Sequence, residues 1–186
     1  MPIDPTDAIS ASLKRERIAK GWSLADLSER SGVSKAMISK IERAEASPTA
    51  TVLGKLSGAF GLSLSALLAL SEQQGQRLSR LAQQSVWQDP ETGYLRRSVS
   101  PSHHGMLELL EIELPGQARV PYPATAFSFQ QQQIWVTQGV LEFQEGALTH
   151  RLEVGDCLQL GPPVDCSFFN PQGQVCKYLI ALVRRA

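Results

Sequence analysis

The sequence is poor in cysteine, and its opposite charges cancel. Three cysteines occur among 186 residues, all of them after residue 150. They show no C-x-x-C spacing, so neither a disulfide framework nor a zinc knuckle is expected, and reduced thiols in a cytoplasmic protein are favoured. Eighteen basic and eighteen acidic residues leave no net charge. Net charge alone therefore cannot hold this chain to nucleic acid.

The sequence also lacks long apolar runs. No stretch of about eighteen apolar residues is present, so no membrane-spanning helix is expected. The opening MPIDPTDAIS carries acids in place of a basic segment followed by an apolar one, which argues against a signal peptide. Hydrophobic residues nevertheless make up 42% of the chain, enough for a packed core. A length of 186 residues suits one large domain or two small ones.

The pattern of apolar residues changes near residue 71. Before it, apolar side chains recur at helical intervals, and five short helices are expected in residues 1–70, the last at Leu64–Leu70. Residues 71–86 are polar and are expected to form a partly helical linker. In residues 87–186 apolar and polar residues alternate between Gly and Pro turns. This alternation predicts an all-β domain of many short strands.

Local signals mark the helix ends within the first part. Ser23 precedes LADLSERS, with Asp26 three residues on as an acidic variant of the capping box. Gly32 ends that helix, and Ser34 begins the next, KAMISKIER. Three residues of this second helix are expected to point inward: Met37, Ile38 and Ile41. A helix, a glycine turn and a second helix predict a helix-turn-helix unit, because Gly permits positive φ.

These residues resemble the Cro/C1-type (XRE) helix-turn-helix family over residues 9–70. The resemblance rests on many coincident positions: Arg17, Gly21, Leu24, Leu27, Gly32, Val33, Ser34, Ile38, Ile41-Glu42-Arg43 and Ser47-Pro48-Thr49. The same stretch is also similar to regulators of sulfur utilisation. Leu24 departs from the family pattern, because many members carry a DNA-contacting glutamine there. That contact is expected to be missing.

The resemblance implies that Ser34–Arg43 is a recognition helix whose N-terminal end enters the major groove of DNA. It places base contacts at Lys35, Ala36, Ser39 and Lys40. It places phosphate contacts at two helix N-termini and one arginine: Ser23, Ser34 and Arg43. Arg17 and Glu42 match positions that form a structural ion pair in the family. The simpler alternative is an ordinary helical bundle with a solvated lysine face.

A single unit of this kind covers one half-site and neutralises few phosphates, so it binds DNA weakly by itself. Members of the family dimerise on palindromes whose halves lie about 34 Å apart. The resemblance therefore implies a homodimer on a palindromic operator. Edge strands of the second domain are the expected dimer platform.

The second part of the chain resembles the cupin fold, a double-stranded β-helix barrel. Metal cupins carry two blocks, G-x5-H-x-H-x(3,4)-E-x6-G and G-x5-P-x-G-x2-H-x3-N. Here the first block runs from Gly116 to Gly139 and the second from Gly155 to Asn170. The four metal-ligand positions hold other residues: Tyr122, Ala124, Gln132 and Cys166. The resemblance therefore implies a barrel with neither a metal nor another cofactor.

The replaced positions predict a pocket for a small molecule. Alternate residues of a strand share a face, so Gln132 is expected inward with Ile134 and Val136. The other glutamines of the run, Gln130, Gln131 and Gln133, are expected at the surface or in a bulge. The expected ligand contacts are Tyr122, Gln132, Ile134, Cys166 and Phe168. Two alternatives stay open: Gln132 as a core amide bonded to backbone, and Cys166 as a small buried hydrophobe or a redox-sensitive thiol.

Together these patterns predict a ligand-responsive DNA-binding transcriptional regulator that is not an enzyme. A metabolite of unknown identity would change its affinity for an operator, as repressor or as activator. Two other functions stay open. One is a cupin enzyme with a DNA-binding head, although no inward acid, base or metal ligand stands out. The other is a constitutive DNA-binding protein whose barrel only dimerises.

Overall fold

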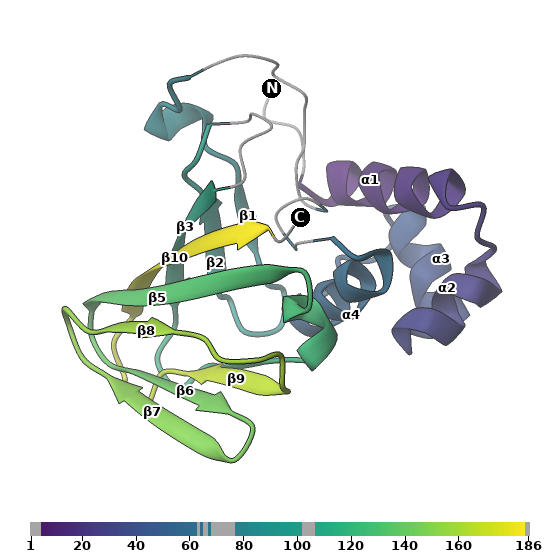
Figure 1. Cartoon of the computed structure of the whole chain (residues 1–186). Helices are drawn as coiled ribbons and strands as arrows, with labels where there is room; N and C mark the ends of the chain where they lie inside the picture. The colour runs from purple at the N-terminus through teal and green to yellow at the C-terminus, as the bar shows by residue number, and fades with distance from the viewer. Residues whose placement is uncertain (1–4, 63, 65–66, 68–76, 102–106, 185–186) are drawn as a thin grey trace.

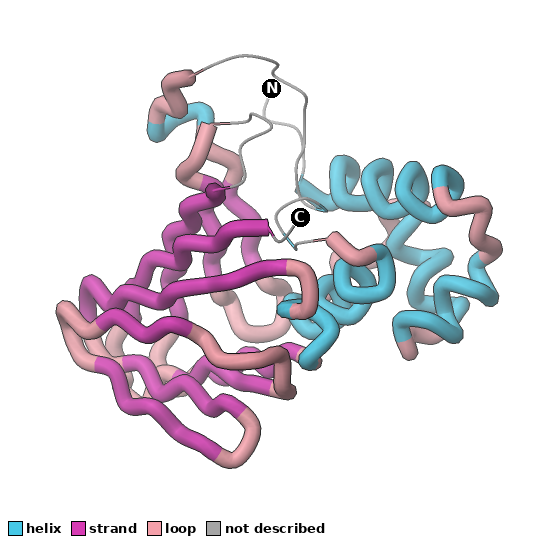
Figure 2. The backbone as a smooth tube through the Cα atoms, viewed as in Figure 1, coloured by secondary structure: helices cyan, strands magenta, loops and turns pink. Residues whose placement is uncertain are grey.

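The computed structural model describes residues 5–62, 64, 67, 77–101 and 107–184 of the chain. Helices gather on one side of the molecule and strands on the other (Figure 1, Figure 2). The helical module comes first in the chain, and the β-domain follows. Among the described residues, no helix is long and apolar enough to cross a bilayer.

Residues 5–62 form four α-helices: α1 (Pro5–Ala19), α2 (Leu24–Ser31), α3 (Lys35–Glu42) and α4 (Ala50–Phe60). The predicted start signals of α2 and α3 are confirmed. Ser23 and Asp26 make the capping box, and the Ser34 side chain accepts a hydrogen bond from the backbone N–H of Met37. Gly32 ends α2 with a φ of 66°, a left-handed conformation that glycine adopts at little cost. Local cap and turn residues thus define the helix-turn-helix.

Two other predictions concern residues that are only partly described. The predicted fifth helix, Leu64–Leu70, lies outside the described residues except for Leu64 and Leu67, which are both buried. Of the predicted linker, residues 77–86 are described. They contain a short 3-10 helix, η1 (Leu81–Gln83), and the first strand begins at Val86.

The β-domain consists of two antiparallel sheets. The larger sheet has the strand order β1-β2-β3-β10-β5-β8, and the smaller sheet has the order β4-β9-β6-β7. A second 3-10 helix, η2 (Ala124–Phe127), lies between β4 and β5. The strands are β1 (Val86–Gln88), β2 (Leu95–Ser98), β3 (Leu107–Leu114), β4 (Arg119–Tyr122), β5 (Gln130–Gln138), β6 (Leu141–Glu145), β7 (Leu148–Leu152), β8 (Cys157–Gln159), β9 (Cys166–Phe169) and β10 (Cys176–Arg184).

The two sheets share one core, but over the strands that the structure describes they do not close into the predicted barrel. Phe168 of β9 stacks on Tyr178 of β10 across the interior, with ring centroids 5.9 Å apart. At the edge of the larger sheet, β8 has only three residues, and Gly161-Pro162-Pro163 follows shortly after it. Proline has no backbone N–H to donate, so ladder pairing cannot continue there toward the smaller sheet. The prediction of a closed barrel is therefore wrong. The domain is an open two-sheet fold of the jelly-roll class, which includes cupins.

Helix α4 joins the two modules. The backbone N–H of Ala50 donates to the Asp89 carboxylate of the β-domain at 2.7 Å. Oγ1 of Thr51 donates to the carbonyl oxygen of Pro121 at 3.1 Å. A carboxylate at a helix N-terminus is favoured by the helix dipole. The helix packs on β4 and η2 as well as on α2, and buried residues of both modules form one continuous core.

Candidate nucleic-acid interface and candidate ligand pocket

One side of α3 presents its side chains to solvent. Three of the predicted base-contact residues are exposed: Lys35, Ala36 and Lys40. The fourth, Ser39, is half-buried. On the opposite side, Ile38 and Ile41 are fully buried and fix α3 within the module. The structure thus places the predicted contacts on a supported, solvent-facing helix, and their contact with DNA stays a prediction.

Met37 does not point inward as predicted. Its exposed fraction is 39%. The eight-residue helix needs only Ile38 and Ile41 to bury its inner side, and Met37 lies three residues before Lys40, within reach of the same exposed side. An unbranched thioether on that side can make apolar contact with a thymine methyl group. Met37 therefore joins the candidate base contacts.

Arg43, a predicted phosphate contact, is paired within its own module. Its Nε and Nη2 donate to the two carboxylate oxygens of Glu45 at 2.7 and 2.8 Å, and Nη1 donates to Oγ of Ser39 at 2.7 Å. The hydrogen bonds to Glu45 raise the pKa of Arg43, and the same bonds lower the pKa of Glu45. The pair is exposed, so water and salt weaken it, and a phosphate can replace Glu45. A phosphate reaches the Nε–Nη2 edge of Arg43 only if the bonds to Glu45 break, whereas the Ser39 hydroxyl can still donate while it accepts from Arg43.

Ser23, the predicted phosphate contact at the start of α2, is hydrogen-bonded to an acidic residue, Asp26. Its Oγ accepts a hydrogen bond from the backbone N–H of Asp26 at 3.1 Å, and its own N–H donates to Asp26 Oδ2 at 2.8 Å. The backbone hydrogen bond from Ser23 holds the pKa of Asp26 below its usual range. A carboxylate here competes with phosphate for the helix end. The neighbouring Leu24 is half-buried against the core, as its apolar character predicts.

The predicted ion pair between Arg17 and Glu42 is present. Arg17 Nε and Nη2 donate to the Glu42 carboxylate at 2.6 and 2.8 Å, and Nη1 donates to the carbonyl oxygen of Trp22 at 2.8 Å. The two side chains are 14% and 7% exposed. This bidentate contact ties the last turn of α1 to the end of α3, and so it sets the direction in which α3 projects.

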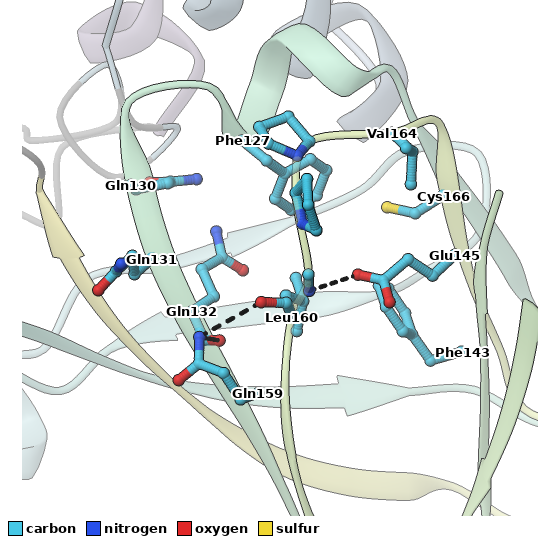
Figure 3. Close-up of a pocket in the computed structure, with 13 residues that line it drawn as sticks. Phe127, Gln130, Gln131, Gln132, Phe143, Glu145, Gln159, Leu160, Val164 and Cys166 are labelled. Atoms are coloured by element: carbon cyan, nitrogen blue, oxygen red, sulfur yellow. Dashed lines mark hydrogen bonds between the residues drawn. The ribbon is translucent and has the colours of Figure 1, made fainter.

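The second candidate site is a pocket of about 500 Å³ in the β-domain (Figure 3). Its lining residues come from η2, β5, β6, the end of β8, the segment after β8, and β9: Phe127, Gln130, Gln131, Gln132, Phe143, Glu145, Gln159, Leu160, Gly161, Pro162, Pro163, Val164 and Cys166. A smaller pocket of about 30 Å³ shares Phe127, Gln130 and Gln132 with it. The larger volume is that of a small-molecule site.

Four of the five predicted ligand contacts lie around these pockets. Gln132 and Cys166 line the larger pocket, while Tyr122, Phe168 and again Gln132 line the smaller one. Tyr122 and Cys166 come together because β4 and β9 pair with these residues in register. Ile134 is fully buried at the next inward position of β5, outside both linings as far as the described residues show.

Three buried polar atoms around the pockets have no hydrogen-bond partner among the described residues. They are the hydroxyl of Tyr122 and the Oε1 atoms of Gln130 and Gln132. The three residues are only 8%, 9% and 7% exposed, respectively. A buried polar atom without a partner costs about 1 to 3 kcal/mol, so natural folds keep few of them. Such atoms are available to hydrogen-bond a molecule that enters the pocket.

The prediction that Gln130 lies at the surface or in a bulge is wrong. Burial alternates from Gln130 to Thr137 of β5, so Gln130 shares the inward face with Gln132 and Ile134. Its Nε2 donates to the carbonyl oxygen of Ala126 at 2.9 Å. Only the amide nitrogen can donate, so this bond identifies Oε1 as the unpaired acceptor.

Sequence reasoning missed Glu145, which lies across the larger pocket from the glutamines of β5 (Figure 3). Its Oε1 accepts a hydrogen bond from the backbone N–H of Gly161 at 2.7 Å, and its Oε2 lies 3.6 Å from Nε2 of His150. The side chain is 15% exposed. A signal was available, because alternation from Leu141 and Phe143 puts Glu145 on the same inward side.

Cys166 contributes a neutral thiol to the pocket. Burial raises its pKa to about 12, and the charges of Glu145 and Asp165 act in the same direction. The protonated thiol is a weak nucleophile near neutral pH and offers a polarisable surface with a weak S–H donor.

The remaining replaced position of the cupin pattern, Ala124, is half-buried in η2. In the described ranges, no group of three or more His, Cys, Asp and Glu side chains is arranged to hold a metal ion. The adjacent histidines His103 and His104 lie outside the described residues.

Comparisons with known proteins place the helical module in a family. The helix-turn-helix family HTH_3 matches residues 13–67. The HTH-type transcriptional regulator SutR of Escherichia coli (strain K12) is 43% identical over 61 residues, which are 33% of this chain and 34% of that protein. The chain therefore matches about a third of the length of this curated relative.

One solved structure is similar along almost the whole chain. It is the crystal structure of an HTH_3 family transcriptional regulator from Vibrio cholerae, which is 25% identical and covers 95% of this chain and 95% of its own, with a TM-score of 0.77. The likeness extends through both the helices and the two sheets. Residues 13–67 thus form a helix-turn-helix domain of the HTH_3 family, in a chain that has the overall fold of a regulator of that family.

Proposed function

We propose that this protein is a sequence-specific DNA-binding transcriptional regulator whose cupin-like β-domain binds a small effector. The observation that carries the proposal is the exposed side of α3, supported by the buried contact between Arg17 and Glu42. A helix held in this way is the element that helix-turn-helix proteins insert into the major groove. Similarity to a regulator along 95% of the chain supports the same function. Its three free cysteines suit the cytoplasm, where a regulator meets DNA.

The proposed base contacts are tested on a duplex selected from a random pool by the wild-type protein. Lys35→Ala and Lys40→Ala each remove a donor to guanine O6 and N7, so each weakens binding by about 5- to 150-fold at fixed salt. Fluorescence anisotropy titrations measure the change. Lys14→Ala is the matched control, because it removes an exposed lysine from α1. Wild-type affinity in both α3 variants would show that α3 is not the recognition helix.

The proposed effector is a small molecule that combines N–H or O–H donors with an apolar part. Its donors would meet acceptors on two walls, Oε1 of Gln130 and Gln132 on one and the Glu145 carboxylate on the other. Its apolar part would pack on four side chains of the same pocket: Phe127, Phe143, Leu160 and Val164. Ligand classes that fit include free amino acids, primary amines and small sulfur compounds.

A panel of these three classes tests the effector proposal through thermal stability. A compound at a hundred times its Kd adds about 2.7 kcal/mol to the free energy of unfolding, which raises Tm by several degrees. The same compound then changes the affinity for the selected duplex. A panel without any Tm shift would favour the alternative function, a constitutive DNA-binding protein whose β-domain only assembles copies.

Catalysis has weaker support than sensing. A reaction in the pocket needs an activated nucleophile or a base that is free to move a proton. The Cys166 thiol is held protonated, with its pKa raised to about 12 by burial. Oε1 of Glu145 already accepts a hydrogen bond from the backbone N–H of Gly161, so it is not free to act as a base. These groups are suited to holding a molecule in place.

We also propose that two copies bind DNA together through the outer face of the larger sheet. Four exposed apolar residues lie on this face: Leu107, Leu109, Trp135 and Val183. The register joins them into one area, because Val183 pairs with Leu107 and Leu179 pairs with Trp135. A second copy is the expected occupant, since one helix-turn-helix unit covers only half of a palindromic site. This face replaces the sheet edges as the proposed platform.

The oligomeric state measured by analytical ultracentrifugation tests the dimer proposal. Trp135→Glu puts a charge into the proposed interface and should yield a monomer with weakened operator binding. Leu148→Glu is the matched control, because Leu148 is exposed on the smaller sheet. A dimer that survives Trp135→Glu would place the interface elsewhere.

A further inference from the structure

Helix α4 contacts the β-domain directly through its backbone at two glycines, Gly54 and Gly58. A Cβ atom added to Gly54 would lie 2.7 Å from Cδ1 of Tyr122, closer than carbon atoms pack. A Cβ added to Gly58 would lie 2.7 Å from Oγ1 of Thr125 and 2.9 Å from its carbonyl carbon. The helix backbone itself therefore contacts Tyr122 and Thr125. Close approach of this kind is what helical glycine permits, at a cost of about 1 kcal/mol in helix propensity per residue.

The contact runs along one face of the helix. Thr51 bonds to the carbonyl of Pro121, and a Cβ on Gly61 would meet the ring of Phe129 at 3.5 Å. Together with Gly54 and Gly58, the helix positions follow the three- and four-residue spacing of a single helix face. They lie in order along the corner of the β-domain formed by residues 121–129. Helix α4 also packs on α2 of the helix-turn-helix, so it spans from that corner to the DNA-binding unit.

Tyr122 belongs both to this contact and to the smaller pocket, which adjoins the larger one through the shared residues Phe127, Gln130 and Gln132. Its ring lies on Gly54, while its buried hydroxyl faces the Tyr94 side chain and makes no hydrogen bond of standard geometry among the described residues. The ring is also fixed edge-on against Phe127 and Phe168, with centroid distances of 6.0 and 5.9 Å. Burial raises the pKa of Tyr122 well above its ordinary value, so the hydroxyl stays protonated and can donate as well as accept.

We propose that Tyr122 couples the pocket to the DNA-binding module through Gly54 and Gly58 of α4. An occupant that extends from the larger pocket past Gln130 and Gln132 into the smaller one, and hydrogen-bonds the Tyr122 hydroxyl there, displaces the ring. The ring lies directly on the helix backbone, and a close-packed interior passes a shift of a few tenths of an ångström on to α4. The movement of α4 changes how α2 and α3 are presented to DNA. The inference rests on the proposed function and adds the route by which the two sites communicate.

Such coupling is reciprocal, because it is a free energy shared by two binding events. If an occupant of the pocket changes DNA affinity through α4, then DNA must change the corner at residues 121–129. Both directions can be measured without knowing the effector. The duplex selected by the wild-type protein serves as the probe in each case.

The first measurement compares three glycine variants by anisotropy on that duplex. Gly54→Ala and Gly58→Ala wedge α4 away from the corner and should change the Kd by about fivefold or more, although neither residue lies on α3. Gly173→Ala is the matched control, since nothing lies within 4 Å of its added Cβ. Alanine strengthens an isolated helix, so unwinding of α4 does not account for a loss of affinity. Circular dichroism confirms that each variant is folded.

The second measurement uses hydrogen exchange of the wild-type chain with and without the duplex. We expect DNA to change amide protection in residues 119–129, far from α3 in the sequence. Unchanged exchange there overturns the proposal, and so do folded Gly54→Ala and Gly58→Ala proteins that match Gly173→Ala. If the glycine variants do not fold, the exchange measurement decides alone. A wild-type chain that selects no duplex refutes the proposed function itself, a result distinct from tight DNA binding without coupling.

Discussion

The helical module and the β-domain differ in how they treat buried polar groups. In the described part of the helical module, no buried side-chain nitrogen or oxygen lacks a partner. Oγ of Ser31, for example, donates to the carbonyl of Leu27 at 2.6 Å. The β-domain leaves the hydroxyl of Tyr122 and the Oε1 atoms of Gln130 and Gln132 unpaired around its pockets.

The difference follows from where each module meets its partner. DNA is bound at the surface, where water satisfies polar groups until the partner arrives, so the interior of the helical module can be fully paired. A small molecule bound inside the β-domain needs hydrogen-bonding groups that are already buried, at a cost in folding stability. The helical module can therefore bind its partner while all of its described buried polar groups are hydrogen-bonded, whereas the β-domain keeps some buried polar atoms unpaired for a ligand.

The largest effect is expected from breaking a satisfied contact in the helical module. Arg17→Ala leaves the Glu42 carboxylate, which is 7% exposed, without its bidentate partner. We expect the free energy of unfolding to fall by about 2 to 3 kcal/mol, somewhat below the value for a fully buried pair because Arg17 keeps some contact with water. Urea denaturation measures it. Arg43→Ala breaks an equally short but exposed pair with Glu45 and should leave stability unchanged. Equal losses in both variants would contradict the distinction.

A smaller effect of opposite sign is expected in the β-domain. Gln132→Leu removes an unpaired buried amide oxygen and should raise the free energy of unfolding by about 1 kcal/mol, while it abolishes any effector response. Gln133→Leu is the matched control, because this neighbour is exposed and its Nε2 donates to Oε1 of Gln159. Urea denaturation of both variants measures the difference. Marked destabilisation by Gln132→Leu would mean that Gln132 is a core amide.

The helix-turn-helix could be predicted from sequence because its signals are local. The Ser34 hydroxyl bonds to a backbone N–H three residues away, and Gly32 adopts its φ of 66° within the turn itself. Met37 was assigned to the wrong side because two fully buried residues, Ile38 and Ile41, already close the inner side of so short a helix. The number of residues that a helix buries depends on its neighbours, which helical spacing alone does not reveal.

The pocket was less predictable because it depends on where strands begin and which elements meet. Alternation correctly placed Gln132 inward. The sequence did not reveal that β5 begins as early as Gln130, because η2 interrupts the pattern just before the strand, and so Gln130 was not assigned to it. The contact of α4 with the β-domain joins residues far apart in the chain. Its only sequence signal is a pair of glycines, Gly54 and Gly58, four residues apart in a helix that they weaken.

The smallest expected effect concerns Arg43, a predicted phosphate contact whose guanidinium pairs with the Glu45 carboxylate. Phosphate competes with Glu45 for the Nε–Nη2 edge of Arg43, because that edge already donates to both carboxylate oxygens. Glu45→Gln weakens that competing pair and should tighten binding to the selected duplex by about twofold to fivefold, the range of an exposed ion pair. Stability should not change.

Glu153→Gln separates this local effect from bulk charge. It removes an equal negative charge from an exposed residue of the β-domain, just after β7, so both variants raise the net charge of the chain from 0 to +1. If general attraction to DNA were the cause, the two variants would gain affinity equally, and the gain would vanish together at high salt. A gain confined to Glu45→Gln identifies Arg43 as a phosphate contact. A loss of affinity would instead show that Glu45 positions Arg43 for DNA. The pair between Arg43 and Glu45 would then assist the phosphate contact of Arg43 and would not compete with it.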